Sequence, residues 1–288
     1  MVESGCALVI ILGLLSALLS PAVAADYDLP ILRGSNQPPA PVVTVGPATF
    51  TRWSGFYFGG DFSFNNGTAN FSTATAPLVE FALQNTVVQQ TFAPSQLQLL
   101  GNGAGNAFGG GAFLGYNTQW QDLVVGVEAN YTHTSVNAAA ATPSTFQIAR
   151  AFIPPAGNVS SVTLTNAAGR LSLTDYGEAR ARAGYVLGNF LPYGFVGMVV
   201  GMGSYSISTR VDVTCALPSP GECIGYPLSP NSAQSNAIFW GYSVGAGLDW
   251  ALTPNFFLRG EFDFDQFAPV SNISLSLISG RLGAGLKF

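Results

Sequence analysis

The strongest constraint on the fold is an alternation of apolar and polar residues with a period of two. In residues 55–65 (GFYFGGDFSFN), four of the five even-numbered positions are Phe, whereas the odd-numbered positions are polar or small. Successive side chains of a β-strand point to opposite faces, so this period indicates a strand with one apolar face. The same pattern recurs in 123–132, 178–185, 240–250, 258–265 and 278–288.

These segments and the connections between them predict a closed barrel. Two glycine-rich segments, 109–120 and 193–206, are also strand-like, although the sequence leaves their facing open, and they raise the total to eight. The connections are tight at 119–122, 186–190 and 252–255, long at 66–107, 134–168 and 208–236, and short at 266–272. Short turns at one end and long loops at the other are typical of outer-membrane barrels. We predict an all-β fold, an eight-stranded antiparallel up-and-down transmembrane β-barrel with long extracellular loops.

The composition favours a membrane protein. Charged residues make up 9% of the chain, against about 25% in a typical soluble protein. So few Lys and Arg argue against a nucleic-acid partner, because phosphates need basic side chains to neutralise them. A competing interpretation, a transmembrane helix over 183–208 with the G-x-x-x-G of Gly197 and Gly201, is less favoured because glycines and Pro192 crowd this segment.

The N-terminal region is typical of an exported protein. Residues 7–19 are an apolar run too short to span a bilayer, and an A-x-A site follows at 22–24. We expect residues 1–25 to be a cleaved signal peptide, although the basic residue common before such a run is absent and leaves the true start open. Residues 26–50, with many prolines, are predicted to be a periplasmic linker, and 51–288 the barrel.

Two cysteines remain after the predicted cleavage. Cys215 and Cys223 lie eight positions apart in an exported chain. Because oxidising compartments favour disulfides, we predict that they form one, with two free thiols as the alternative.

Most charged residues of the predicted strands fall on the face opposite the apolar one, which is the lumen of the barrel. An eight-stranded barrel is just wide enough for side chains to fill it, and an unpaired buried charge is costly. We therefore predict a paired charge network in the lumen that plugs the barrel, with an ion-selective path as the alternative. Its members are Asp61, Glu128, Glu178, Arg180, Arg182, Asp249, Arg259, Glu261, Asp263 and Arg281.

The sequence gives little support to an enzyme. The single histidine, His133, lies two residues before Ser135 at the predicted membrane rim, which resembles the His-x-Ser arrangement of outer-membrane lipid A deacylases. A polar rim residue is the simpler interpretation. The glycine-rich run 101–105 lacks the Lys and Ser/Thr of a phosphate-binding loop, and no cluster has metal-ligand spacing. We expect no enzymatic activity, no metal and no cofactor.

Several motifs resemble the small porin-like outer-membrane proteins of Gram-negative alphaproteobacteria, which share an eight-stranded barrel of the outer membrane protein A type. The similarity covers residues 26–288. The motifs are Ala25-Asp26 with the Pro-rich leader, WSGFYFGG at 53–60, GYNTQW at 115–120, RARAGY at 180–185 with LPY at 191–193, and GYSVGAGLDW at 241–250. This resemblance implies a location in the outer membrane, with membrane lipid and lipopolysaccharide as neighbours.

The last eight residues resemble the signal that the barrel-assembly machinery reads on its clients, which makes that machinery an expected partner. Arg281, Gly283, Leu286 and Phe288 fit its pattern. Three functions remain. The first is a structural or surface-interaction protein that binds an extracellular ligand through its loops, the second is a narrow or gated porin, and the third is a lipid A-modifying enzyme. The long loops favour the first, because recognition sites lie on loops held by rigid scaffolds.

Overall fold

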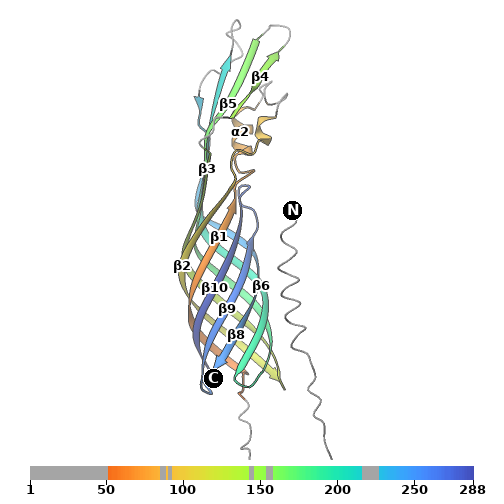
Figure 1. Ribbon diagram of the computed structural model, residues 1–288, viewed down its shortest axis with the longest axis vertical. Helices are drawn as coiled ribbons and strands as arrows, with labels where there is room; N and C mark the ends of the chain where they lie inside the picture. Colours follow the sequence, from red (N-terminus) through yellow and green to blue (C-terminus); the bar gives the residue numbers. More distant parts are fainter. Residues whose placement is uncertain (1–50, 85–88, 90–92, 143–145, 154–157, 216–226) are drawn as a thin grey trace, which may run out of the picture. The chain divides into compact units, whose positions relative to one another are not determined.

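The computed structural model describes residues 51–84, 89, 93–142, 146–153, 158–215 and 227–288. The predicted signal peptide, 1–25, and linker, 26–50, lie outside these residues and stay predictions. Eight antiparallel strands form a closed ring (Figure 1). In order around the ring they are β1 Gly55–Asn70, β2 Asn102–Trp120, β3 Leu123–Thr142, β5 Asn158–Tyr185, β6 Phe190–Cys215, β8 Asn231–Ala251, β9 Phe256–Phe267 and β10 Ser274–Lys287.

The first and last strands close the ring. Tyr57 of β1 lies opposite Lys287 of β10, and the pairing continues as far as Asn70 opposite Ser274. The connections β2–β3, β5–β6 and β8–β9 are the tight turns predicted above. In the turn between β5 and β6, Gly188 has a φ of 64°, a left-handed conformation in which a side chain would be strained. The predicted up-and-down barrel is therefore confirmed.

Two of the three predicted long loops are shorter than expected, whereas the long connection within 66–107 and the short one at 266–272 are confirmed. Segment 134–168 is mostly strand, because β3 continues to Thr142 and β5 begins at Asn158, with β4 Phe146–Ile153 paired to β5. Segment 208–236 likewise contains the end of β6, the short β7 Pro227–Leu228 and the start of β8. A strand beyond the lipid needs no apolar outer face. These Ser-, Thr- and Ala-rich stretches therefore lack the alternation by which the other strands were found.

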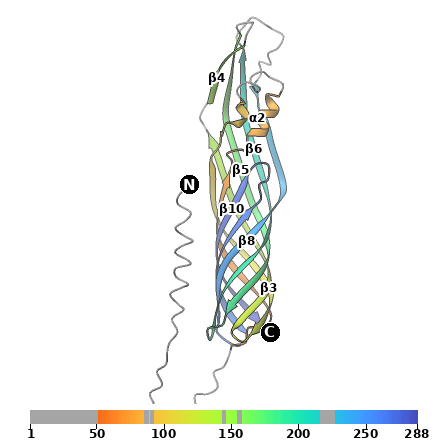
Figure 2. The ribbon, with the colours of Figure 1, turned by 90° about the vertical axis from the view of Figure 1, so that its right-hand side faces the viewer.

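The long connection between β1 and β2 contains the helical elements. These are α2 Ala76–Ala82 and the 3₁₀ helix η1 Pro94–Gln96. In the part of the chain that is described, no helix has the length and hydropathy needed to cross a membrane. Both ribbon views place α2 and β4 at the same end of the strands, away from the C-terminus (Figures 1 and 2).

The outward face of the ring has an apolar band between two groups of aromatic residues. Leu114, Val127, Val196, Met198 and Leu282 are among its exposed side chains, which also settles the facing of the two glycine-rich segments. Aromatic residues near the tight turns are Phe56, Phe58, Tyr116, Trp120, Tyr185, Phe190, Trp250 and Phe288, and those farther along the strands are Phe64, Phe108, Tyr131, Trp240 and Tyr242. Such a band with aromatic girdles is the lipid-facing surface of a transmembrane barrel.

Two buried apolar clusters lie inside the described region. The turn-side cluster consists of Trp53, Tyr57, Phe113, Val124, Val186, Leu191, Ala251 and Phe257. The larger loop-side cluster combines inward residues of the ring, such as Val199, Phe239 and Leu277, with Val79 and Leu83 at α2. It continues through Leu164 and Val211 into the strands beyond the lipid-facing band. We call this part, formed by the described residues of 71–101 together with 134–142, 158–174 and 203–215, the extension.

Candidate functional site

The lumen of the ring between the two apolar clusters contains the ten charged residues predicted from the sequence. All ten lie on the inward face of their strands; Asp61 is half-buried and the other nine are buried. They come from β1, β3, β5, β8, β9 and β10. Strand alternation directs them inward, because their neighbours on each strand are the side chains of the lipid-facing band.

Two arginines of β5 connect it to strands around the lumen. Arg180 pairs with Glu128 of β3 and Glu261 of β9. Arg182 lies 2.7 Å from Asp249 of β8 and 3.1 Å from Glu128. Each guanidinium therefore bridges carboxylates from two other strands, and its planar set of donors suits this role.

The other two arginines complete the network. Arg259 lies 2.8 Å from both Asp249 and Glu128. Arg281 lies 3.0 Å from Glu178 and 2.6 Å from Asp263. Because every arginine of the network contacts two or more carboxylates, the lumen is crossed by ion pairs in several directions. Such a buried network is costly to open, since removal of one partner leaves its counter-charges unpaired.

Aromatic residues that the sequence analysis did not single out support these ion pairs. The hydroxyl of Tyr57 donates to Glu128 at 2.7 Å, and that of Tyr193 donates to Glu261 at 2.7 Å. The guanidinium of Arg182 lies 3.7 Å from the centre of the Tyr193 ring. These tyrosines occupy inward positions of strands whose outer face is apolar. The alternation along each strand could therefore have identified them as lumen residues.

Two further charged residues were also missed. Asp265 and Lys287 continue the alternation of β9 and β10, and both are buried on the inward side. The Lys287 ammonium donates to the carbonyl oxygen of Arg52 at 2.8 Å and lies 4.0 Å from the centre of the Trp53 ring. Lys287 thus belongs to the turn-side end of the lumen and Asp265 to the loop-side end.

The single histidine lies outside the lumen. On the outward face of β3, two residues beyond Tyr131, Nδ1 of His133 is 2.8 Å from Oδ1 of Asp175. The Tyr131 hydroxyl donates to the same oxygen at 2.6 Å. Asp175 is thus the shared partner of Tyr131, one of the girdle residues, and His133. The His133 side chain is 70% exposed, and Ser135 is on the same face.

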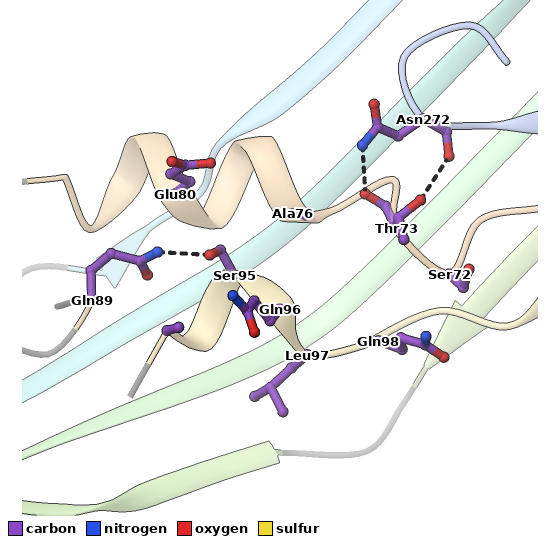
Figure 3. Close-up of a pocket in the computed structure, with 11 residues that line it drawn as sticks. Ser72, Thr73, Ala76, Glu80, Gln89, Ser95, Gln96, Leu97, Gln98 and Asn272 are labelled. Atoms are coloured by element: carbon purple, nitrogen blue, oxygen red, sulfur yellow. Dashed lines mark hydrogen bonds between the residues drawn. The ribbon is translucent and has the colours of Figure 1, made fainter. Parts of the chain in front are cut away.

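A pocket of about 480 Å³ opens in the extension (Figure 3). The Thr73 hydroxyl donates to the carbonyl oxygen of Asn272 at 3.3 Å, and the Asn272 amide donates back to the carbonyl oxygen of Thr73 at 3.4 Å. On another wall, the Gln89 amide donates to the Ser95 hydroxyl at 2.7 Å. The pocket is lined by Ser72, Thr73, Ala76, Glu80, Gln89, Ala93, Ser95, Gln96, Leu97, Gln98 and Asn272.

The predicted assembly signal lies on both faces of β10. Arg281 points inward, whereas Leu286 and Phe288 are exposed on the outside. The Phe288 ring stacks on Phe58 with 5.8 Å between ring centres. Gly283 lies opposite Asp61, where a Cβ would come within 2.8 Å of the Gly60 carbonyl oxygen. Recognition by the assembly machinery stays a prediction.

The predicted disulfide is not tested by the structure. Cys215 is the last residue of β6. Cys223 and the Cys215 side chain lie outside the part that is described. The bond therefore stays a prediction.

A closed eight-stranded ring with a lipid-facing apolar band, aromatic girdles and a filled lumen defines an integral outer-membrane β-barrel. Comparison with known proteins agrees. The chain belongs to the family described as the outer membrane protein beta-barrel domain, which matches residues 39–276. The protein is located in the outer membrane.

Individual relatives are distant. The chain is 25% identical over 257 residues to a 22 kDa outer membrane protein of Rhizobium leguminosarum bv. viciae, a match that covers 86% of this chain and 82% of the relative. Among solved structures, it is similar to Neisserial surface protein A, with 15% identity, a TM-score of 0.37 and coverage of 82% of this chain and 98% of the other. It is also similar to Ail, the attachment invasion locus protein of Yersinia pestis, with 11% identity, a TM-score of 0.32 and coverage of 82% and 99%.

Proposed function

We propose that this barrel is a sealed scaffold that holds a structured surface outside the cell for interaction with a ligand. The observation that carries the proposal is the filling of the lumen. Four arginines bridge carboxylates across it, and buried apolar clusters lie on both sides of them. An ion crossing the lumen would have to break buried ion pairs and pass through apolar side chains, both of which are unfavourable.

The extension supports the second half of the proposal. Outer-membrane barrels place their short turns in the periplasm, so the extension faces the cell exterior. Its strands and the loop-side end of the lumen share the loop-side cluster. Within this cluster, Phe71, Val136 and Leu171 are fully or almost fully buried. A surface with such a core is ordered before it meets a ligand, and pre-ordering reduces the entropy lost on binding.

The chemistry of the pocket indicates the kind of ligand. Among the described residues that line it, amides and hydroxyls predominate, and Glu80 is the single charged one. Such groups donate and accept hydrogen bonds without imposing a net charge on a ligand. We therefore propose a neutral, hydroxyl-rich extracellular ligand, of which a carbohydrate is the most direct example.

The two alternatives have less support. A narrow or gated porin would require the ion pairs of the lumen to part. An enzyme that modifies lipid A would use His133, whose contact with Asp175 supplies a carboxylate partner at the rim of the barrel. A polar rim cluster explains the same contact without catalysis, and we propose that the protein has no enzymatic activity.

Conductance measurements on single molecules in a planar bilayer test the sealed lumen. The protein must first be shown to be folded, by the shift in gel mobility that a barrel undergoes on heating. We expect no steps in current for the wild-type protein. Arg180→Ala should lower the free energy of unfolding by about 3–5 kcal/mol, because Glu128, Glu178 and Glu261 lose their shared partner.

This variant should leave the bilayer almost as silent as the wild type does, because the apolar clusters stay in place. Arg210→Ala removes an exposed ion pair with Asp212 in the extension and serves as a control that should change neither stability nor current. Steady current steps from folded wild-type protein would contradict the proposal and favour a pore.

A further inference from the structure

Three carboxylates converge at the loop-side end of the lumen. Glu178 comes from β5, and Asp263 and Asp265 come from the same face of β9. One oxygen of each lies within 4.8 Å of the others. All three residues are buried, and Asp263 and Asp265 have no exposed surface. Because like charges this close repel strongly in a low-dielectric interior, the group requires something positive among its members.

Nearby protein groups satisfy this requirement only in part. Arg281 lies between Glu178 and Asp263, and the Ser243 hydroxyl donates to Glu178 at 3.3 Å. Oδ1 of Asp263 accepts no hydrogen bond, and beside Asp265 lie only the Ser243 hydroxyl, which Glu178 also accepts, and Glu178 itself. Fully buried, ionised carboxylates that share so few donors are among the most costly arrangements in a protein interior.

The charged side chains of the whole lumen also carry an excess of negative charge. Among the described residues that face it, seven are carboxylates: Asp61, Glu128, Glu178, Asp249, Glu261, Asp263 and Asp265. Five are cations: Arg180, Arg182, Arg259, Arg281 and Lys287. The excess is two negative charges, which one divalent cation would neutralise.

We propose that Glu178, Asp263 and Asp265 bind a calcium ion inside the barrel. The available donors are oxygens alone, and these suit hard cations. Calcium lies about 2.3–2.6 Å from its ligands, so ligand oxygens on opposite sides of it are separated by about twice that distance. The spread of up to 4.8 Å among the three carboxylates fits this geometry. The Ser243 hydroxyl, beside Glu178, offers a further oxygen.

The position of the site determines when the ion enters. Asp265 lies opposite Leu277 and Ser243 in the sheet, and the loop-side cluster, with Leu277 and Phe267, covers the site toward the extension. Toward the periplasm, Arg281 and the ion-pair network close it. The ion is therefore taken up while the barrel forms and exchanges slowly afterwards, so a chelator added to folded protein is a poor test.

Refolding in defined metal provides the test. Protein unfolded in urea with EDTA is refolded into phosphatidylcholine vesicles in CaCl₂, in MgCl₂ or in EDTA, and free metal is removed before elemental analysis. We expect about one calcium per chain after refolding in CaCl₂, together with a higher temperature of unfolding than in EDTA, because a ligand that binds the folded state alone stabilises it. MgCl₂ should have a smaller effect, because magnesium requires shorter and more regular coordination.

The variant Asp265→Asn keeps the size of the side chain and removes one charge. It should fold, lose the bound calcium, and unfold at the same temperature in CaCl₂ and EDTA. Asp61→Asn is the matched control, since it removes a carboxylate of the lumen outside the cluster and should retain both the calcium and the stabilisation.

Two results would overturn the proposal. One is wild-type protein that contains no calcium and is equally stable in CaCl₂ and EDTA, in which case a proton shared among the carboxylates balances the charge. The other is Asp265→Asn protein that still binds one calcium, which would place the ion elsewhere.

Discussion

At the scale of single residues, the lumen depends on glycines that leave space for aromatic rings. A Cβ at Gly115 would lie 2.3 Å from the Tyr57 hydroxyl oxygen, and one at Gly247 would lie 2.5 Å from that of Tyr193. Both hydroxyls donate to carboxylates of the ion-pair network. The rings and the charges thus occupy the lumen together only because these strand positions have no side chain.

Gly247→Ala should therefore lower the free energy of unfolding by about 1–3 kcal/mol, the usual range for overpacking a tight interior. Gly260→Ala is the control, because its Cβ would meet only a Leu282 methyl at 3.8 Å and should change the value by less than about 0.5 kcal/mol. Urea unfolding in vesicles, followed by tryptophan fluorescence, measures both. Equal stability of the two variants would show that Tyr193 moves aside at no cost.

At the scale of elements, β10 combines two roles on its two faces. Its inward residues, including Arg281, Ser279 and Lys287, contribute to the lumen, whereas Leu282 and Phe288 are each 72% exposed on the outside. Both side chains face lipid or its interface, so truncating either one removes a transfer free energy of comparable size from the folded barrel. A residue whose loss harms biogenesis more than the other therefore acts before the barrel is complete.

Phe288→Ala should reduce the amount of folded barrel in the outer membrane of cells several-fold, because the proposed assembly signal loses its aromatic end. Refolding of the purified variant in vesicles should be nearly normal. Leu282→Ala, equally exposed on the same strand, should assemble normally in cells. Quantitative gels of heated and unheated membranes measure the folded fraction, and equal loss for both variants would contradict a terminal signal.

At the scale of the whole described region, the barrel and the extension share the continuous strands β3, β5 and β6 and the loop-side cluster, but the barrel does not need the loop between β1 and β2. Asn70 and Asn102 lie directly opposite each other where β1 and β2 end. The loop between them contributes Phe71, Val79 and Leu100 to the loop-side cluster and most of the pocket lining. Every pairing within the ring lies outside this loop.

Replacing residues 71–101 by Asn-Gly, a favoured two-residue hairpin turn, should therefore leave the ring able to form. The gel shift on heating should persist, whereas binding of neutral oligosaccharides, tested on a glycan array with the full protein in detergent, should be lost. Replacing Thr253-Pro254 in a tight turn by the same dipeptide is the control and should preserve both. Unchanged glycan binding without the loop would show that the pocket is not the contact site.

The sequence predicted the ring well because lipid imposes a pattern on each strand. Leu123–Thr132 and Trp240–Trp250 show the alternation expected of a strand with one lipid-facing side, and the same alternation directed Arg180 and Glu261 into the lumen. Beyond the lipid this requirement ends, and the outer halves of β5 and β6 resembled loops. The pocket was unpredictable for another reason, since Thr73 and Asn272 meet only through the closure of the ring.

The placement of the basic residues determines which of them a labelling reagent can reach when the protein is on a cell. The sole lysine, Lys287, donates to the Arg52 carbonyl oxygen beneath the Trp53 ring, and four arginines lie in the lumen. Among the described residues, the exposed basic side chains are Arg52, Arg170 and Arg210. Amine-directed labels therefore find no lysine on the outside of the folded barrel. Surface inventories that rely on such labels will undercount this protein even where it is abundant.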